Sequence, residues 1–273
     1  APTVRETRAR NQYVYRGLDV HRTIPGNTDE IIAEGNQTSA DSVDLYRLNL
    51  NTGRTTLLTS GRPSDLTEEW LLDSKLVPRV VVAGVKDELT RVVYYRKGAD
   101  APWTEIARYS RDKGSVFVPL AFESDDQMLQ VATNKDRDTM AVYRYDPNNK
   151  KLGELIASHP RYDMGADSQG QRTAGVLVSQ ADDKIVGYRV QGDKPETVWT
   201  DEGRAKTQRM LDAALPNVIN DFRRTPDGKR LLVTSYSDTK PTRWYLLDEQ
   251  KLTLEEIGSA RPFEITTVPV WAS

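Results

Sequence analysis

The chain has 273 residues and a formal net charge of −2, from 38 basic and 40 acidic residues. This balance creates no long-range field that would attract nucleic acid or an anionic membrane, so we expect neither as a partner. The absence of cysteine excludes disulfides, thiolate metal sites and cysteine nucleophiles. It fits both the cytosol and the bacterial periplasm, and we slightly favour the periplasm. No stretch approaches the ~20 apolar residues of a membrane span.

In chain order, the sequence repeats a unit of short candidate strands. The unit starts with an apolar strand, seen at 17–23, 116–122 and 218–223. A turn rich in Asp and Gly and a second strand follow in five copies, at 25–33, 73–83, 124–132, 181–188 and 225–234. An alternating third strand then enters a turn and a short fourth strand, at 44–59, 91–107, 141–157 and 243–258.

A tyrosine marks the third strand of these repeats. Tyr46, Tyr94, Tyr143 and Tyr245 are separated by 48, 49 and 102 residues, so the last step spans two periods and contains a degenerate repeat. Four antiparallel strands in about fifty residues are typical of a propeller blade. We therefore predict an all-β fold, a β-propeller of four-stranded antiparallel blades. This chain contains about five of them, as a whole propeller or as part of one with seven or eight.

The repeat also predicts the organisation of the chain. One helix is predicted at 201–215, with acidic residues in its first turn and Pro216 just beyond it, as an insertion in the fourth repeat. The propeller should cover 13–263, between an N-terminal segment, 1–12, and a linker or tail, 264–273. The blades are expected near 13–61, 65–110, 115–160, 162–216 and 217–263.

Residues for independent chemistry are scarce. A serine hydrolase needs Gly-x-Ser-x-Gly on a strand-to-helix turn, and the nearest string, around Ser168, lies in a polar loop. The only two histidines, His21 and His159, are too few for a triad or an imidazole metal cluster. We expect structural hydrogen bonds for both, with Asp19 on the same strand face as His21. No catalytic residue, metal site or cofactor is predicted.

Paired acidic residues are the remaining candidates. Asp125-Asp126 and Asp182-Asp183 occupy the repeated turn, where Asp suits the backbone geometry. Glu68 and Glu69 instead precede Trp70 at the start of a strand. Paired carboxylates at a propeller mouth could bind the amine of a peptide through charge-assisted hydrogen bonds. Glu68 and Glu69 are therefore the candidate substrate-binding residues, and a solvated strand entrance is the alternative interpretation.

Several segments resemble a known family. Four segments near the C-terminal end resemble the non-catalytic propeller of prolyl oligopeptidase and acylaminoacyl-peptidase-like serine peptidases. They are Thr-Pro-Asp-Gly-Lys-Arg-Leu-Leu-Val at 225–233, the run at 235–241, Tyr-Leu-Leu-Asp at 245–248 and Ala-Arg-Pro at 260–262. Segments 16–20, 134–138 and 192–199 are similar to other parts of that propeller, so the resemblance spans most of 16–263. The Pro-Asp-Gly-Lys pattern also occurs in TolB-like periplasmic propellers.

The resemblance implies a function. It suggests a gating and substrate-selecting domain of a serine peptidase, a hydrolase acting on short peptides, whose α/β-hydrolase catalytic domain is absent from this chain. The catalytic Ser, Asp and His of that family have no matching positions here, so none is assigned. One alternative is a freestanding TolB-like periplasmic propeller that binds a protein or polymer. Another is a glycosidase-type propeller, which would need acidic residues from different blades to converge.

Overall fold

A computed structural model describes residues 16–86, 89–179, 184–192, 194–225 and 227–260. The predicted N-terminal segment 1–12, the tail 264–273, the turn residues 181–183 and the Ala-Arg-Pro residues 261–262 lie outside these ranges. The chain divides into two compact units, one up to Thr200 and one from Asp201 onward. Within the described residues, no helix combines the length and apolar composition that a membrane crossing requires.

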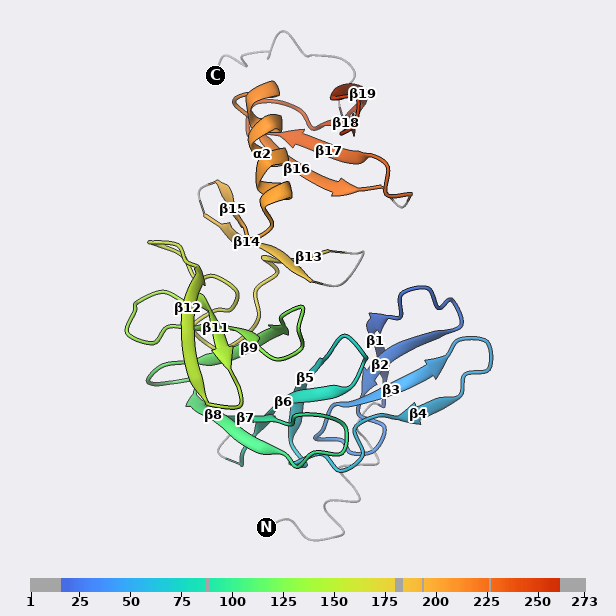
Figure 1. Ribbon diagram of the computed structural model, residues 1–273, viewed down its shortest axis with the longest axis vertical. Helices are drawn as coiled ribbons and strands as arrows, with labels where there is room; N and C mark the ends of the chain where they lie inside the picture. Colours follow the sequence, from blue (N-terminus) through green and yellow to red (C-terminus); the bar gives the residue numbers. More distant parts are fainter. Residues whose placement is uncertain (1–15, 87–88, 180–183, 193, 226, 261–273) are drawn as a thin grey trace, which may run out of the picture. The chain divides into compact units, whose positions relative to one another are not determined.

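The strands form five antiparallel sheets, and each sheet is a meander of strands that follow one another along the chain (Figure 1). The first two sheets consist of β1 (Leu18–Thr23), β2 (Glu30–Gly35), β3 (Asp44–Asn49) and β4 (Thr55–Leu57), then β5 (Thr67–Leu72), β6 (Pro78–Gly84), β7 (Thr90–Tyr95) and β8 (Thr104–Ser110). The third and fourth consist of β9 (Phe117–Phe122), β10 (Leu129–Thr133), β11 (Ala141–Asp146) and β12 (Lys151–Ala157), then β13 (Val176–Val178), β14 (Ile185–Gln191) and β15 (Pro195–Trp199). The fifth consists of β16 (Ile219–Arg224), β17 (Leu231–Tyr236), β18 (Arg243–Asp248) and β19 (Thr253–Ser259).

This architecture confirms the predicted fold class. Four sheets contain four strands, and the fourth sheet contains three among the described residues. The three-stranded sheet corresponds to the fourth repeat, in which the sequence pattern is degenerate. The fold is thus all-β, built from antiparallel propeller blades.

One turn recurs between the third and fourth strands of a blade. Asn49, Asp146 and Asp248 each accept hydrogen bonds from the backbone N–H groups two and three positions later, at 2.9–3.1 Å. These side-chain bonds close the turn before the strands pair. The residue four positions after each of them has a left-handed backbone, with φ of 69°, 52° and 53° at Gly53, Lys150 and Leu252.

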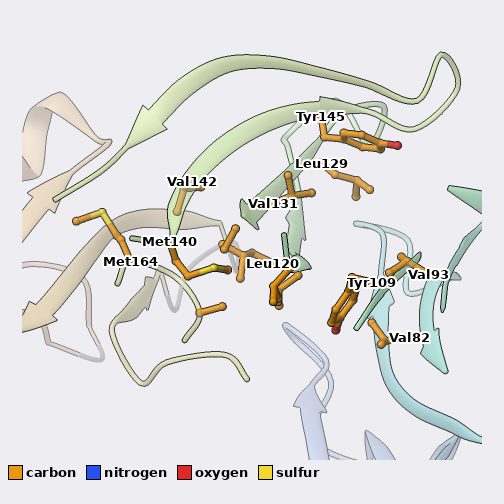
Figure 2. Close-up of a cluster of buried hydrophobic side chains, with 14 of the residues drawn as sticks. Val82, Val93, Tyr109, Leu120, Leu129, Val131, Met140, Val142, Tyr145 and Met164 are labelled. Carbon is orange, nitrogen blue, oxygen red and sulfur yellow. The ribbon is translucent and has the colours of Figure 1, made fainter. Parts of the chain in front are cut away.

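The largest core lies in the first unit, between the second and third sheets and the segment that follows them. Figure 2 shows Val82 and Val93 from the second sheet together with Leu129, Val131 and Tyr145 from the third. Leu129 and Val131 are completely buried. Burying such side chains contributes roughly 1.5–3 kcal/mol each, so the sheets stabilise one another through this contact.

Hydrogen bonds also connect one sheet of this unit to the next. The Trp70 indole Nε1 donates to the carbonyl oxygen of Val43 at 2.7 Å, which joins β5 to the first sheet. The Tyr145 hydroxyl donates to the carbonyl oxygen of Ile106 at 3.0 Å, which joins β11 to β8. These bonds satisfy polar groups that packing would otherwise bury without partners.

The second unit has its own core. Helix α2 (Glu202–Ala214) begins after Asp201, whose carboxylate accepts a hydrogen bond from the Arg204 N–H at 2.8 Å. Leu211 of the helix is buried against a cluster from the fifth sheet, which contains Leu231 and Val233. The helix predicted at 201–215 is therefore present, and it packs on the fifth sheet (Figure 1).

Candidate substrate-binding site

Strand β5 positions the two candidate glutamates of the first unit. In the pairing of β5 with β6, the register shifts between Thr67 and Glu69. Such a β-bulge inserts an extra residue into one strand and changes the direction of the side chains next to it. Glu68 and Glu69 therefore follow one another at a distorted point of the strand, and each meets a different set of partners.

Two arginines bind the carboxylate of Glu68. Its carboxylate accepts a hydrogen bond from Arg91 Nε at 2.6 Å and another from Arg111 Nη2 at 3.3 Å. It lines a cleft of about 440 Å³ between the first and second sheets, together with Asp19, Glu34 and Asp41. Two guanidinium groups neutralise the charge of Glu68, so this carboxylate mainly organises the wall of the cleft.

Glu69 has a looser environment. Among the described residues, the nearest cationic atom is Arg172 Nε, 4.0 Å from the Glu69 carboxylate, which is too long for a hydrogen bond. The Glu69 side chain is 46% exposed. Desolvation by the surrounding protein raises the pKa of the Glu69 carboxyl above its usual range, and the neighbouring Arg172 partly opposes this rise. The carboxylate is therefore accessible and incompletely compensated.

Arg172 cannot simply move onto Glu69. Its guanidinium donates hydrogen bonds to the carbonyl oxygens of Pro119, at 3.0 Å, and of Leu120, both on β9. Arg172 itself lies in the connection between the third and fourth sheets. One side chain thus links three repeats, because it belongs to the fourth, binds the third and faces Glu69 of the second. Losing the two carbonyl contacts would leave buried acceptors unpaired.

The surroundings of the two glutamates are acidic. Four carboxylates line the cleft, those of Asp19, Glu34, Asp41 and Glu68, and Glu34 also pairs with His21 Nδ1 at 2.7 Å. Glu69 lies outside this lining and interacts electrostatically with Glu68 and Glu34. These five carboxylates are called the acidic cluster. Burial and then the negative charge of Glu69 raise the pKa of Tyr109 to about 12, so its hydroxyl remains protonated at neutral pH. Such a surface favours a cationic ligand over an anionic one. In the described ranges, no group of three or more carboxylate or imidazole side chains is placed to hold a metal ion.

Both histidines form structural contacts, as expected, but His21 does not pair with the expected Asp19. His21 pairs with Glu34 on the neighbouring strand β2, because the bulge in β1 after Val20 disturbs the alternation that would place Asp19 beside it. The buried His159 accepts hydrogen bonds at Nδ1 from two backbone N–H groups of the following turn, each at 3.1 Å, and Nε2 lies 3.3 Å from Glu196 Oε2.

The other polar residues that the sequence analysis considered lie in turns where the structure describes them. Asp125 accepts a hydrogen bond from the Gln127 N–H at 2.9 Å, and Asp126 has a φ of 55°. Ser168 lies in a turn that Asp167 closes through the N–H groups of Gln169 and Gln171. Asp182 and Asp183 lie outside the described residues. Sequence reasoning missed the partners of the glutamates because no local motif marks them. Arg91 and Arg111 come from or directly follow other strands of the second sheet, and Arg172 comes from a distant repeat.

Comparison with known proteins gives a consistent result at the level of the fold. No protein-family model matches the chain, and no curated protein matches it either. Among solved structures, it is similar to TolB from Acinetobacter baumannii, with a TM-score of 0.40 and 10% identity over 80% of this chain and 49% of that one. It is also similar to the β-propeller domain of the Trilobed protease from Pyrococcus furiosus. The TM-score is 0.41, and the identity is 9% over 89% of this chain and 71% of that one.

A third similar structure is the acylaminoacyl peptidase of Pyrococcus horikoshii, with a TM-score of 0.41 and 8% identity over 89% of this chain. The chain spans 39% of that peptidase and about half of TolB. At this level of identity the similarities concern the fold alone.

Proposed function

We propose that this chain is the substrate-selecting propeller of a serine peptidase that acts on short peptides. Its partner is then an α/β-hydrolase domain of the same polypeptide, which performs the cleavage. The propeller gates access and binds the amino terminus of the peptide. The observation that supports this role is the accessible, incompletely compensated carboxylate of Glu69 in an acidic cluster.

The chemistry of a peptide amino terminus fits this environment. An ammonium group has three N–H donors and a positive charge, and a carboxylate is its natural acceptor. Glu69 supplies that acceptor, whereas Glu68 is already bound by Arg91 and Arg111. In this role Glu69 is the recognition residue and Glu68 is a positioning residue.

The test is a binding measurement on the purified chain with tri-alanine and with its N-acetyl form. We expect tri-alanine to bind, and acetylation to weaken binding about tenfold or more, because it removes the charge. Glu69→Gln should cause a similar loss for tri-alanine. Glu105→Gln is the matched control, because Glu105 forms an exposed pair with Arg108 at 2.7 Å on β8. Equal affinity for both peptides would refute amine recognition.

The alternative function is a freestanding TolB-like periplasmic propeller with a protein or polymer partner. The acidic cluster also supports this alternative, since four of its carboxylates line one cleft and offer acceptors to a basic partner. Calorimetry with poly-lysine distinguishes the two functions. Association that depends on Glu69, combined with no binding of tri-alanine, would favour the alternative.

A further inference from the structure

A second cleft opens in the first unit, between the third and fourth sheets. It has a volume of about 450 Å³, which is within the usual range of ligand pockets. None of its lining residues belongs to the acidic cleft or to the Glu69 and Arg172 pair. Its apolar lining comes from both sheets and consists of the exposed Leu155 and four half-buried side chains, Phe122, Ile156, Ile185 and Trp199.

The charged residues of this second cleft neutralise each other. Arg144 Nε binds the carboxylate of Glu123 at 2.9 Å, and Arg144 Nη1 binds that of Glu154 at 2.7 Å. The hydrogen bond that Arg144 donates to Glu123 is the main reason that the pKa of Arg144 lies above its ordinary value. Lys184 also lines the second cleft, so its two carboxylates and two cationic groups balance each other. A ligand without net charge therefore suits this cleft better than an ion.

One donor group in the second cleft is oriented but unused. Gln130 accepts a hydrogen bond at Oε1 from the hydroxyl of Tyr188, which is completely buried. This bond fixes which end of the Gln130 amide carries the N–H donors. Gln130 lines the cleft, and within the described part of the chain its amide N–H groups have no acceptor. A carbonyl oxygen of a ligand would supply one.

The edge of the third sheet borders the same cleft. Strand β12 is the last strand of its meander and pairs only with β11 among the described strands. Three consecutive residues of β12, from Glu154 to Ile156, line the cleft, and Leu155 is 49% exposed. An exposed aliphatic side chain on an edge strand is unusual, because edges normally carry charges or are covered. An extended peptide can pair with such an edge through its backbone.

We propose that this second cleft binds an extended, uncharged peptide segment. One large apolar side chain of that segment lies against Ile156 and Trp199, and a backbone carbonyl accepts a hydrogen bond from Gln130. The ligand is thus the backbone and apolar side chain of a peptide, whereas the acidic cluster recognises an amino terminus. This second site does not depend on the proposed peptidase role.

The experiment titrates the ¹⁵N-labelled chain with N-acetyl-Leu-Phe-amide, which has neither a free amine nor a charge. We expect saturable shift changes at the residues lining the second cleft, and about tenfold weaker binding of N-acetyl-Gly-Ser-amide. Because the probe cannot engage Glu69 as an ammonium group, the result is independent of the tri-alanine test.

Two variants make the test specific. Leu155→Asp places a charge at the mouth of the cleft and should weaken binding about tenfold. Ile257→Asp is the matched control, because Ile257 is 50% exposed and occupies the same position relative to the tyrosine of its sheet. Unchanged spectra at millimolar peptide, shifts confined to other surfaces, or equal losses in both variants would overturn the proposal.

Discussion

At the scale of single residues, Glu69 makes stability depend on pH in an unusual direction. A raised pKa means that the folded chain holds the Glu69 proton more tightly than the unfolded chain does. The associated stability is complete below the ordinary carboxyl pKa and is lost as pH rises through the raised value. Most paired carboxylates behave in the opposite way, because their pKa is lowered by folding.

We therefore expect Glu69→Gln to be more stable than the unchanged chain at about pH 8 and equally stable at about pH 4. The difference should stay below about 1 kcal/mol, because a half-exposed carboxyl is screened by solvent. Urea unfolding at the two pH values measures it. Glu105→Gln should show no such pH dependence, and a Glu69→Gln variant that is less stable at high pH would contradict the assigned direction.

At this scale the sequence supported only part of the site. Glu68 and Glu69 stand out as an acidic pair next to Trp70. Their different roles depend on Arg91, Arg111 and Arg172, which reach them across strands and repeats. No local pattern encodes such contacts, because the chain folds back between them. The sequence therefore identified only the adjacent pair of glutamates. In the structure two arginines bind Glu68, whereas Glu69 is half-exposed.

At the scale of elements, the turn between the third and fourth strands provides a reciprocal test. Leu252 adopts the left-handed conformation with a φ of 53° and is 70% exposed. This conformation costs a non-glycine residue roughly 1–2 kcal/mol, and glycine avoids most of that cost. Leu252→Gly should therefore stabilise the chain by about 0.5–1 kcal/mol after the entropy loss of glycine is included.

The reverse substitution is the control. Gly53 occupies the same turn position in the first sheet, and a Cβ atom added there would meet no atom within 4 Å. Gly53→Leu should therefore destabilise the chain through backbone strain alone, by about 1 kcal/mol. Thermal or urea unfolding measures both variants. If both change stability in the same direction, the left-handed conformation is not what governs this turn.

The elements themselves were largely predictable because they follow the repeat. The first strands expected at 116–122 and 218–223 correspond to β9 and β16, since alternating apolar residues between Asp and Gly turns encode a strand locally. The helix expected at 201–215 is α2, marked by Asp201 and Pro216. The sheet on which this helix packs was not predictable. An apolar stripe on a helix indicates that this face is buried, but it does not identify the sheet that buries it.

At the scale of the whole molecule, side-chain hydrogen bonds join the repeats of the first unit to one another. The Tyr145 hydroxyl donates one of them, since it reaches from β11 to the Ile106 carbonyl on β8 at 3.0 Å, and burial raises the pKa of Tyr145 to about 12. Tyr145→Phe should cost about 1–2 kcal/mol, because the carbonyl then lacks a partner in a buried position.

The matched control is Tyr143→Phe on the same strand. Tyr143 is half-buried, and within the described residues no hydrogen bond from its hydroxyl is seen. We expect a stability change near zero for Tyr143→Phe in urea unfolding. Equal losses in the two variants would mean that ring packing, and not the bond between sheets, carries the contribution of Tyr145.

Arg172 also constrains how such a chain can evolve. Each blade is a self-contained meander, so tandem duplication or deletion of a whole blade is a natural route by which propellers change in size. The Arg172 guanidinium, however, needs Glu69 from the second blade and two carbonyl groups from the third at the same time. A blade inserted or lost between the second and fourth would separate these partners. The contacts of Arg172 therefore fix the order of the second, third and fourth blades.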